Sequence, residues 1–362
     1  MSVGSFVYQG SPQRVVFGRG ALAGLPREVE RLGLMRVLVL STPGQSKAAD
    51  AIATLLGGAG RRVFAEARMH TPIEVTEAAM GVVRDEAIDG TLAVGGGSTT
   101  GLGKAIALRT DLPQIVVPTT YAGSEITNIL GETAGGQKKT IRDAKVLPEV
   151  VVYDVDLTLS LPPLVSVTSG MNAIAHAAEG LYARDGNPIL SLMAEEGVRA
   201  LAAPLVRISR APGDVDAREL ALYGAWLCGT VLAGTSMALH HKLCHVLGGS
   251  FDLPHAETHA VVLPHVIAYN SEAAPYPILR LARALGVTDA AGGLFDLASE
   301  AGAPTALRDL GMPESGLDRA ADLAVADPYW NPRPLERDAI RSLLDDAWHG
   351  RRPVAAEGAG HA

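Results

Sequence analysis

The chain has 362 residues, of which 48% are hydrophobic and 19% charged, and its formal net charge at pH 7 is −8. This length is sufficient for two domains, and the composition is that of an ordinary globular protein. The negative charge argues against a nucleic-acid partner, which would require a basic face.

The N-terminal segment has neither a basic stretch nor an apolar stretch, so we expect no signal peptide. Apolar runs elsewhere are interrupted before about 20 residues, so we expect no membrane span. Cys228 and Cys244 lie in apolar helical sequence without CxxC spacing, which favours buried, reduced thiols. These features predict a cytoplasmic protein that does not bind membranes.

Short β-branched runs alternate with helical stretches up to about residue 155. Strands are predicted at residues 14–17, 36–40, 62–65, 91–94, 114–117 and 150–153, and helices between them include residues 47–56 and 73–86. This alternation predicts an α/β domain with a parallel, doubly wound, Rossmann-like sheet over residues 1–158.

Two loops after predicted strands carry the signals for a cofactor. In residues 91–108 a strand runs into Gly95–Gly96–Gly97–Ser98 and then a helix, whose free N–H groups suit a pyrophosphate. Residues 117–127 supply hydroxyls, notably Thr119, Thr120 and Ser124. Either loop alone is also compatible with a tight connection or a helix cap, but together they favour a nucleotide. Residues 18–24 also contain glycines but lack dinucleotide spacing, which indicates an ordinary turn.

The residue that would select between NADH and NADPH is not acidic. After the second predicted strand the chain continues with Ser41 and Thr42, without a carboxylate for the ribose or an adjacent arginine for a 2′-phosphate. Thr42 is the candidate contact at this position, and we expect the protein to use both NADH and NADPH.

Long Ala/Leu-rich segments with helical periodicity follow residue 162, for example residues 191–203, 217–238 and 276–285. They predict an all-helical domain over residues 159–355, joined to the first near residues 154–163 and followed by a short tail at 356–362.

Histidines at helical spacing mark the second candidate site. Asn172 and His176 are four residues apart, as are His241 and His245, and His255 follows a Gly/Pro-containing break. Residues four apart share one helix face. With Asp at position 172 this would be a strong metal site, but an amide adds no charge, and Lys242 beside His241 disfavours a dication. We therefore expect no bound metal.

These motifs resemble the iron-containing alcohol dehydrogenase superfamily, whose fold is similar to that of dehydroquinate synthase. The resemblance rests on residues 95–98, 118–125, 147–158, 170–176 and 241–255, and it covers nearly the whole chain. It implies cofactor contacts from Gly96, Gly97, Ser98, Thr119, Thr120, Ser124 and Lys138. The chain departs from the family at Gly101, where Asp is usual, and at Asn172.

Within that superfamily, residues 69–77, 95–108, 170–184, 240–260 and 330–353 look like maleylacetate reductases. The resemblance implies an NADH- or NADPH-dependent, metal-free reduction of the carbon–carbon double bond of maleylacetate to 3-oxoadipate, in the degradation of aromatic compounds. It further implies a small dicarboxylate substrate and a homodimer.

The mechanistic hypothesis assigns roles to the candidate residues. His245 is the general acid or oxyanion donor, and His241 and His255 orient the substrate. Asn172 donates an amide hydrogen bond, and His176 and Lys242 are candidates for binding carboxylate. A buried core role for His176 and a cap role for His255 remain open, as does a turn role for His70. His240, His259 and His265 are interpreted as structural or supporting residues. A metal-dependent alcohol or polyol dehydrogenase is the alternative enzyme, and a non-catalytic nucleotide-binding protein is the alternative class.

Overall fold

A computed structural model of the chain describes residues 5–135 and 137–354, and the side chains of Gln137 and Lys138 lie outside that description. The chain divides into two compact units. One comprises residues 9–161, and the other comprises the described residues up to Tyr8 together with the chain from Pro162 onward.

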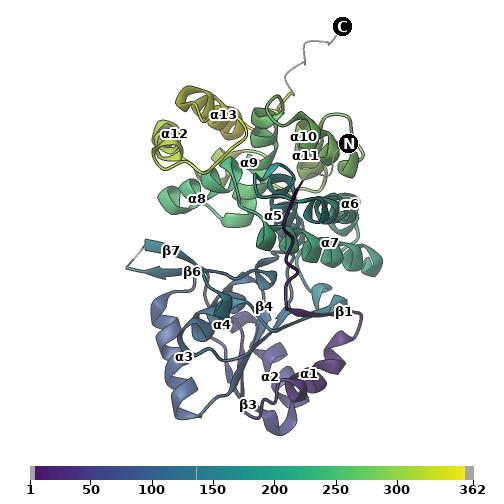
Figure 1. Ribbon diagram of the computed structural model, residues 1–362, viewed down its shortest axis with the longest axis vertical. Helices are drawn as coiled ribbons and strands as arrows, with labels where there is room; N and C mark the ends of the chain where they lie inside the picture. The colour runs from purple at the N-terminus through teal and green to yellow at the C-terminus, as the bar shows by residue number, and fades with distance from the viewer. Residues whose placement is uncertain (1–4, 136, 355–362) are drawn as a thin grey trace. The chain divides into compact units, whose positions relative to one another are not determined.

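A six-stranded parallel sheet forms the centre of the first unit (Figure 1). Its strands are β1 (Arg14–Gly18), β2 (Val37–Leu40), β3 (Gly60–Phe64), β4 (Gly90–Gly95), β5 (Gln114–Pro118) and β8 (Val150–Asp154). The order across the sheet is β1-β8-β5-β4-β2-β3, and every pair is parallel. The predicted α/β class is therefore confirmed.

Helices cover both faces of this sheet. Alternate strand residues such as Val39 and Val94 pack against α1 (Leu25–Arg31) and α2 (Ser46–Leu55). The opposite face meets α3 (Ile73–Asp85) and α4 (Gly97–Thr110) (Figure 1). A Cβ at Gly103 of α4 would be in van der Waals contact with Leu40 and Ala93. All residues of β2, β4, β5 and β8 are buried, which explains why these strands are almost continuously apolar.

An antiparallel hairpin lies outside the main sheet and was not predicted. Its strands are β6 (Ile129–Ala134) and β7 (Gln137–Arg142). The sequence of β7 is mostly polar, and β6 lacks the strict alternation that marks a half-buried strand, so no hydrophobic pattern predicted them. The predicted strand at 62–65 is also displaced, because β3 starts at Gly60.

Helices make up the second unit, as predicted. They are α5 (Pro163–Tyr182), α6 (Pro188–Arg210), α7 (Val215–Gly234), α8 (Leu239–Phe251), α9 (His255–Asn270), α10 (Pro275–Leu285), α11 (Ala290–Glu300), α12 (Leu317–Ala326) and α13 (Arg337–His349). Helix α5 packs against α6, α7 and α9, and all its residues from Ser166 to Tyr182 are buried. Side chains of this central helix are therefore held firmly in place.

The predicted helix at 217–238 is wrong at its C-terminal end. Helix α7 ends at Gly234 and α8 begins at Leu239. Two carboxylates accept hydrogen bonds from backbone N–H groups of the segment between α7 and α8. Asp185 accepts from the N–H of Ser236, and Glu179 accepts from the N–H of Ala238. Among the described residues no single helix is long and apolar enough to cross a membrane; α7 and α8 qualify only as a pair, bent by 96°.

Candidate active site

The turn between β4 and α4 leaves the start of a helix available to an anion. Gly96 is the N-cap, in extended backbone, and no side chain caps the helix. A Cβ at Gly96 would lie 3.0 Å from Thr120, so glycine permits the close approach of the two loops. The uncapped N–H groups and the positive end of the helix dipole suit a pyrophosphate.

Three loops meet at the carboxyl ends of neighbouring strands. Thr42 follows β2, Gly95 ends β4 and Thr119 follows β5. The Thr119 N–H donates to the carbonyl of Gly95 (2.9 Å), and Gln45 Nε2 donates to Thr119 Oγ1 (3.1 Å). Strand order reverses between β2 and β4, which is where open α/β sheets bind ligands. The structure therefore brings Thr42 and Thr119 together, with Gln45 as an unforeseen link.

The hydroxyl-rich loop is anchored by a buried lysine. Lys104 of α4 donates to the carbonyls of Ser124 (2.6 Å), Thr127 (2.7 Å) and Ile129 (2.9 Å). Burial lowers the pKa of Lys104 to about 7, and the nearby Glu125 carboxyl opposes that shift. Ser124 Oγ is buried and has no hydrogen-bond partner within the described part of the chain, so this predicted cofactor contact has an unused polar atom. The side chain of Lys138, also predicted, lies outside the described residues.

The departure at Gly101 has a steric reason. A Cβ at this helical position would lie 2.3 Å from Thr71 Oγ1, so Thr71 occupies the space that a larger residue would need. Thr71 and His70 both have left-handed backbone, with φ of 47° and 65°. The segment after β3 is therefore folded tightly against α4.

Six histidines from three helices form one contiguous group, the histidine cluster. Its members are His176 of α5, His240, His241 and His245 of α8, and His255 and His259 of α9. The rings of His176 and His241 stack at 5.2 Å between centroids, and His259 lies 4.4 Å from His255 and 5.0 Å from His241. The predicted histidines are thus brought together, and His240 and His259 join them.

Glu179 is the acidic member of this site, and the sequence interpretation missed it. Its side chain is fully buried, and its Oε2 accepts from His241 Nδ1 at 2.7 Å. Asn172, His176 and Glu179 are spaced i, i+4 and i+7, so they share one face of α5. That spacing was the signal that could have identified Glu179.

The side chains of the histidine cluster range from buried to exposed. Burial lowers the pKa of His176, His240 and His259 well below the usual value, and neighbouring imidazoles add to the effect. These three rings are therefore neutral at pH 7. His245 and His255 are exposed.

A tyrosine organises the exposed rim. Tyr329 Oη lies 3.2 Å from His245 Nδ1, and the Lys242 ammonium lies 5.5 Å from the Tyr329 ring centroid. Lys242 also pairs with Asp327 at 3.9 Å. Its charge is therefore directed toward the segment after α12, where it contacts Tyr329.

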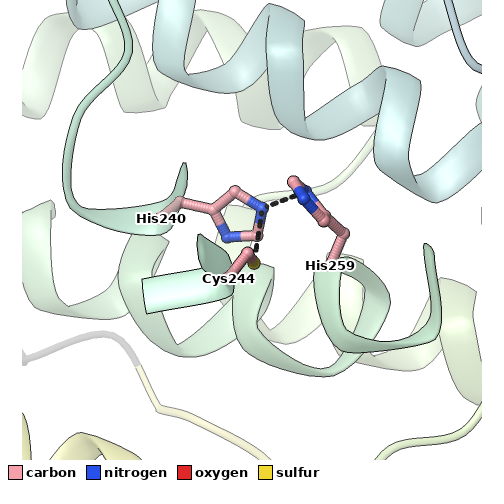
Figure 2. Close-up of side chains that lie close together, drawn as sticks. All are labelled: His240, Cys244 and His259. Carbon is pink, nitrogen blue, oxygen red and sulfur yellow. Dashed lines mark hydrogen bonds between the residues drawn. The ribbon is translucent and has the colours of Figure 1, made fainter. Parts of the chain in front are cut away.

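His240, Cys244 and His259 converge deep in the cluster (Figure 2). His240 Nε2 lies 2.8 Å from His259 Nδ1 and 3.7 Å from Cys244 Sγ. Two nitrogens on one tetrahedral zinc would be about 3.3 Å apart, given Zn–N bonds of about 2.0–2.1 Å. The shorter separation is that of a hydrogen bond, and burial raises the pKa of the Cys244 thiol. This trio therefore supports the ring of His259 through hydrogen bonding.

Comparisons with known proteins agree with this architecture. The iron-containing alcohol dehydrogenase model matches residues 12–155, and the C-terminal model of the Fe-containing alcohol dehydrogenase family matches residues 166–348. The chain is 58% identical to the maleylacetate reductase of Rhizobium sp. (strain MTP-10005), over 96% of this chain and 99% of that one.

Two solved structures are similar over nearly their full length. The maleylacetate reductase from Agrobacterium tumefaciens has 58% identity and a TM-score of 0.94, over 97% of this chain and 100% of that one. A putative alcohol dehydrogenase from Ralstonia eutropha JMP134 has 59% identity and a TM-score of 0.95, with the same coverage. The chain is therefore an oxidoreductase that belongs to the iron-containing alcohol dehydrogenase family, within its group of maleylacetate reductases.

Proposed function

We propose that this enzyme uses NADH or NADPH to reduce the carbon–carbon double bond of maleylacetate, giving 3-oxoadipate, and that it needs no metal. The main support for the proposal is the uncharged amide of Asn172, which lies on the same face of α5 as His176. Among the described residues, the Oδ1 atom of Asn172 and Nε2 of His241 are buried without hydrogen-bond partners, and no carboxylate stands at position 172 to repel a dianionic substrate.

The family name implies iron, and the donor set fits it poorly. A divalent first-row metal favours an anionic oxygen ligand, whereas Asn172 offers only an uncharged amide oxygen. The Glu179 carboxylate is already occupied by His241 and by backbone N–H groups of α8. No step is therefore assigned to a metal.

The cofactor residues fit a nicotinamide dinucleotide, which supplies the hydride. The uncapped N–H groups at Gly97 and Ser98 would bind the pyrophosphate, and the unused Ser124 hydroxyl would donate to it or to a ribose. Thr42 offers neither a carboxylate nor a cation, so both NADH and NADPH are accepted.

The histidine cluster would carry the remaining chemistry. Hydride adds to the alkene carbon that is β to the ketone, and the electron pair of the double bond moves to the keto oxygen. A hydrogen-bond donor in the cluster stabilises this enolate, and a protonated histidine or water then delivers a proton to the adjacent carbon. Exposed His245 and His255, with Lys242 nearby, would bind the substrate carboxylates.

Oxidation of NADH or NADPH, followed at 340 nm with maleylacetate and with simple aldehydes, tests the proposal. We expect turnover with maleylacetate alone, unchanged after treatment with a chelator and unchanged by added Fe²⁺ or Zn²⁺. Activity on aldehydes that a chelator abolishes would instead establish a metal-dependent alcohol dehydrogenase.

A further inference from the structure

We infer that Glu179 is a positioning residue, which holds His241 so that Nε2 of this ring is presented to the substrate. The inference rests on the proposed function and adds a residue that the histidine pattern alone did not contain. It also makes His241, rather than exposed His245, the donor to the enolate oxygen.

The Glu179 carboxylate is fastened on several sides. It accepts from the backbone N–H of Ala238 (2.9 Å) and of His240 (2.8 Å) at the start of α8, and from Tyr182 Oη at a longer 3.4 Å. The N-cap residue of α8, Ala238, makes no side-chain hydrogen bond to the first N–H groups of the helix. The Glu179 carboxylate of α5 accepts these hydrogen bonds instead and so caps α8. It is therefore a fixed reference point for the ring that it contacts.

That contact determines which His241 nitrogen remains available. An ionised carboxylate can only accept a hydrogen bond, so Nδ1 carries the proton in the 2.7 Å contact with Glu179. Nε2 is then the remaining ring nitrogen, and it is buried with no hydrogen-bond partner in residues 5–135 and 137–354 as described. Stacking on His176 restrains the plane of the ring as well.

The chemistry of the substrate gives this free atom one role. A keto-dicarboxylate offers only acceptors, so Nε2 can contact it only by donating an N–H. The Glu179 carboxylate on the other side of the ring fixes the direction in which Nε2 points.

A double-mutant cycle tests the inference. We expect Glu179→Gln to lower kcat by roughly 100-fold, because the ring is no longer held within a fraction of an ångström. The dissociation constant of NADH, measured by fluorescence quenching, should stay within about twofold. In a His241→Ala background, Glu179→Gln should lower kcat by no more than about twofold further, since residues that act as a unit are not additive. Full multiplication of the two effects would overturn the inference.

Two further variants distinguish the loss of His241 positioning from a loss of folding. Asp185→Asn removes an exposed carboxylate that caps Ser236 in the same connection between α7 and α8, and it should leave kcat unchanged. If Glu179→Gln does not fold, Glu179→Asp keeps the charge but shortens the reach, and the same cycle is run with it.

A second readout does not depend on turnover. The ¹⁵N chemical shifts of the His241 ring should show a protonated Nδ1 in the wild type, and this signal should change in the Glu179 variants. An unchanged ring would contradict positioning. Absence of maleylacetate turnover in the wild type would defeat the proposed function alone, because the ring signal still decides the role of Glu179.

Discussion

The two candidate sites use different chemical groups of the chain. The cofactor loops of the first unit use backbone N–H groups, glycines and hydroxyls at consecutive strand ends. The histidine cluster of the second unit uses side chains from three helices, most of them buried. The first site should therefore depend on backbone conformation and space, and the second on the identity and hydrogen bonding of individual side chains.

Replacing a buried histidine of the cluster should reduce activity more than replacing an exposed one. His241→Ala should lower kcat/KM by roughly 1000-fold, within the usual range for loss of an acid–base or oxyanion group. His245→Ala should cost less, because that side chain is exposed. NADH affinity measured in parallel should not change. A larger loss for His245→Ala would restore the role that the sequence hypothesis assigned to it.

The second effect concerns stability at low pH. Burial lowers the pKa of His265 from 6.5 to about 4, so between these values the unfolded chain binds a proton that the folded chain does not. The free energy of unfolding therefore falls as pH falls from 6.5 to 4, by about 3 kcal/mol for this residue. Denaturation of wild type and His265→Leu across pH 4–8 should show a shallower decline in the variant. Parallel declines would mean that the buried histidines do not make the helical unit acid-sensitive.

A third, smaller effect should be confined to the cofactor loops. Gly96→Val places a side chain against Thr120 and should weaken NADH binding by about 2 kcal/mol, or roughly 30-fold, with little change in kcat at saturating cofactor. Gly24→Val is the control, since a Cβ there meets nothing within 4 Å. A fall in kcat rather than affinity would remove the distinction between the two sites.

The smallest effect lies at the rim of the histidine cluster. Tyr329→Phe removes the hydroxyl next to His245 but keeps the ring beneath Lys242. The loss of one exposed hydrogen bond should cost about 1 kcal/mol, or roughly fivefold in KM for the substrate. The neighbouring, exposed Trp330→Phe serves as the control. An effect on NADH binding alone would place Tyr329 outside the substrate site.

Local patterns predicted the elements that bury apolar surface well. The strands at 114–117 and 150–153 and the helix at 73–86 match β5, β8 and α3 to within a residue or two. The β6/β7 hairpin was missed because its polar residues carry no period, and the end of α7 was missed because distant carboxylates terminate it.

The α/β and helical units, the glycine-rich turn and the spacing of the candidate residues could be predicted from the chain alone, because each is a local property; these residues are Asn172, His176, His241, His245 and His255. Which of these side chains are buried, and what holds them, depends on the packing of helices that are distant in sequence. Glu179 meets His241 across 62 positions of sequence, and His240 meets His259 on another helix. Such contacts depend on how helices pack, and packing sets both the free nitrogen of His241 and the neutral state of its neighbours.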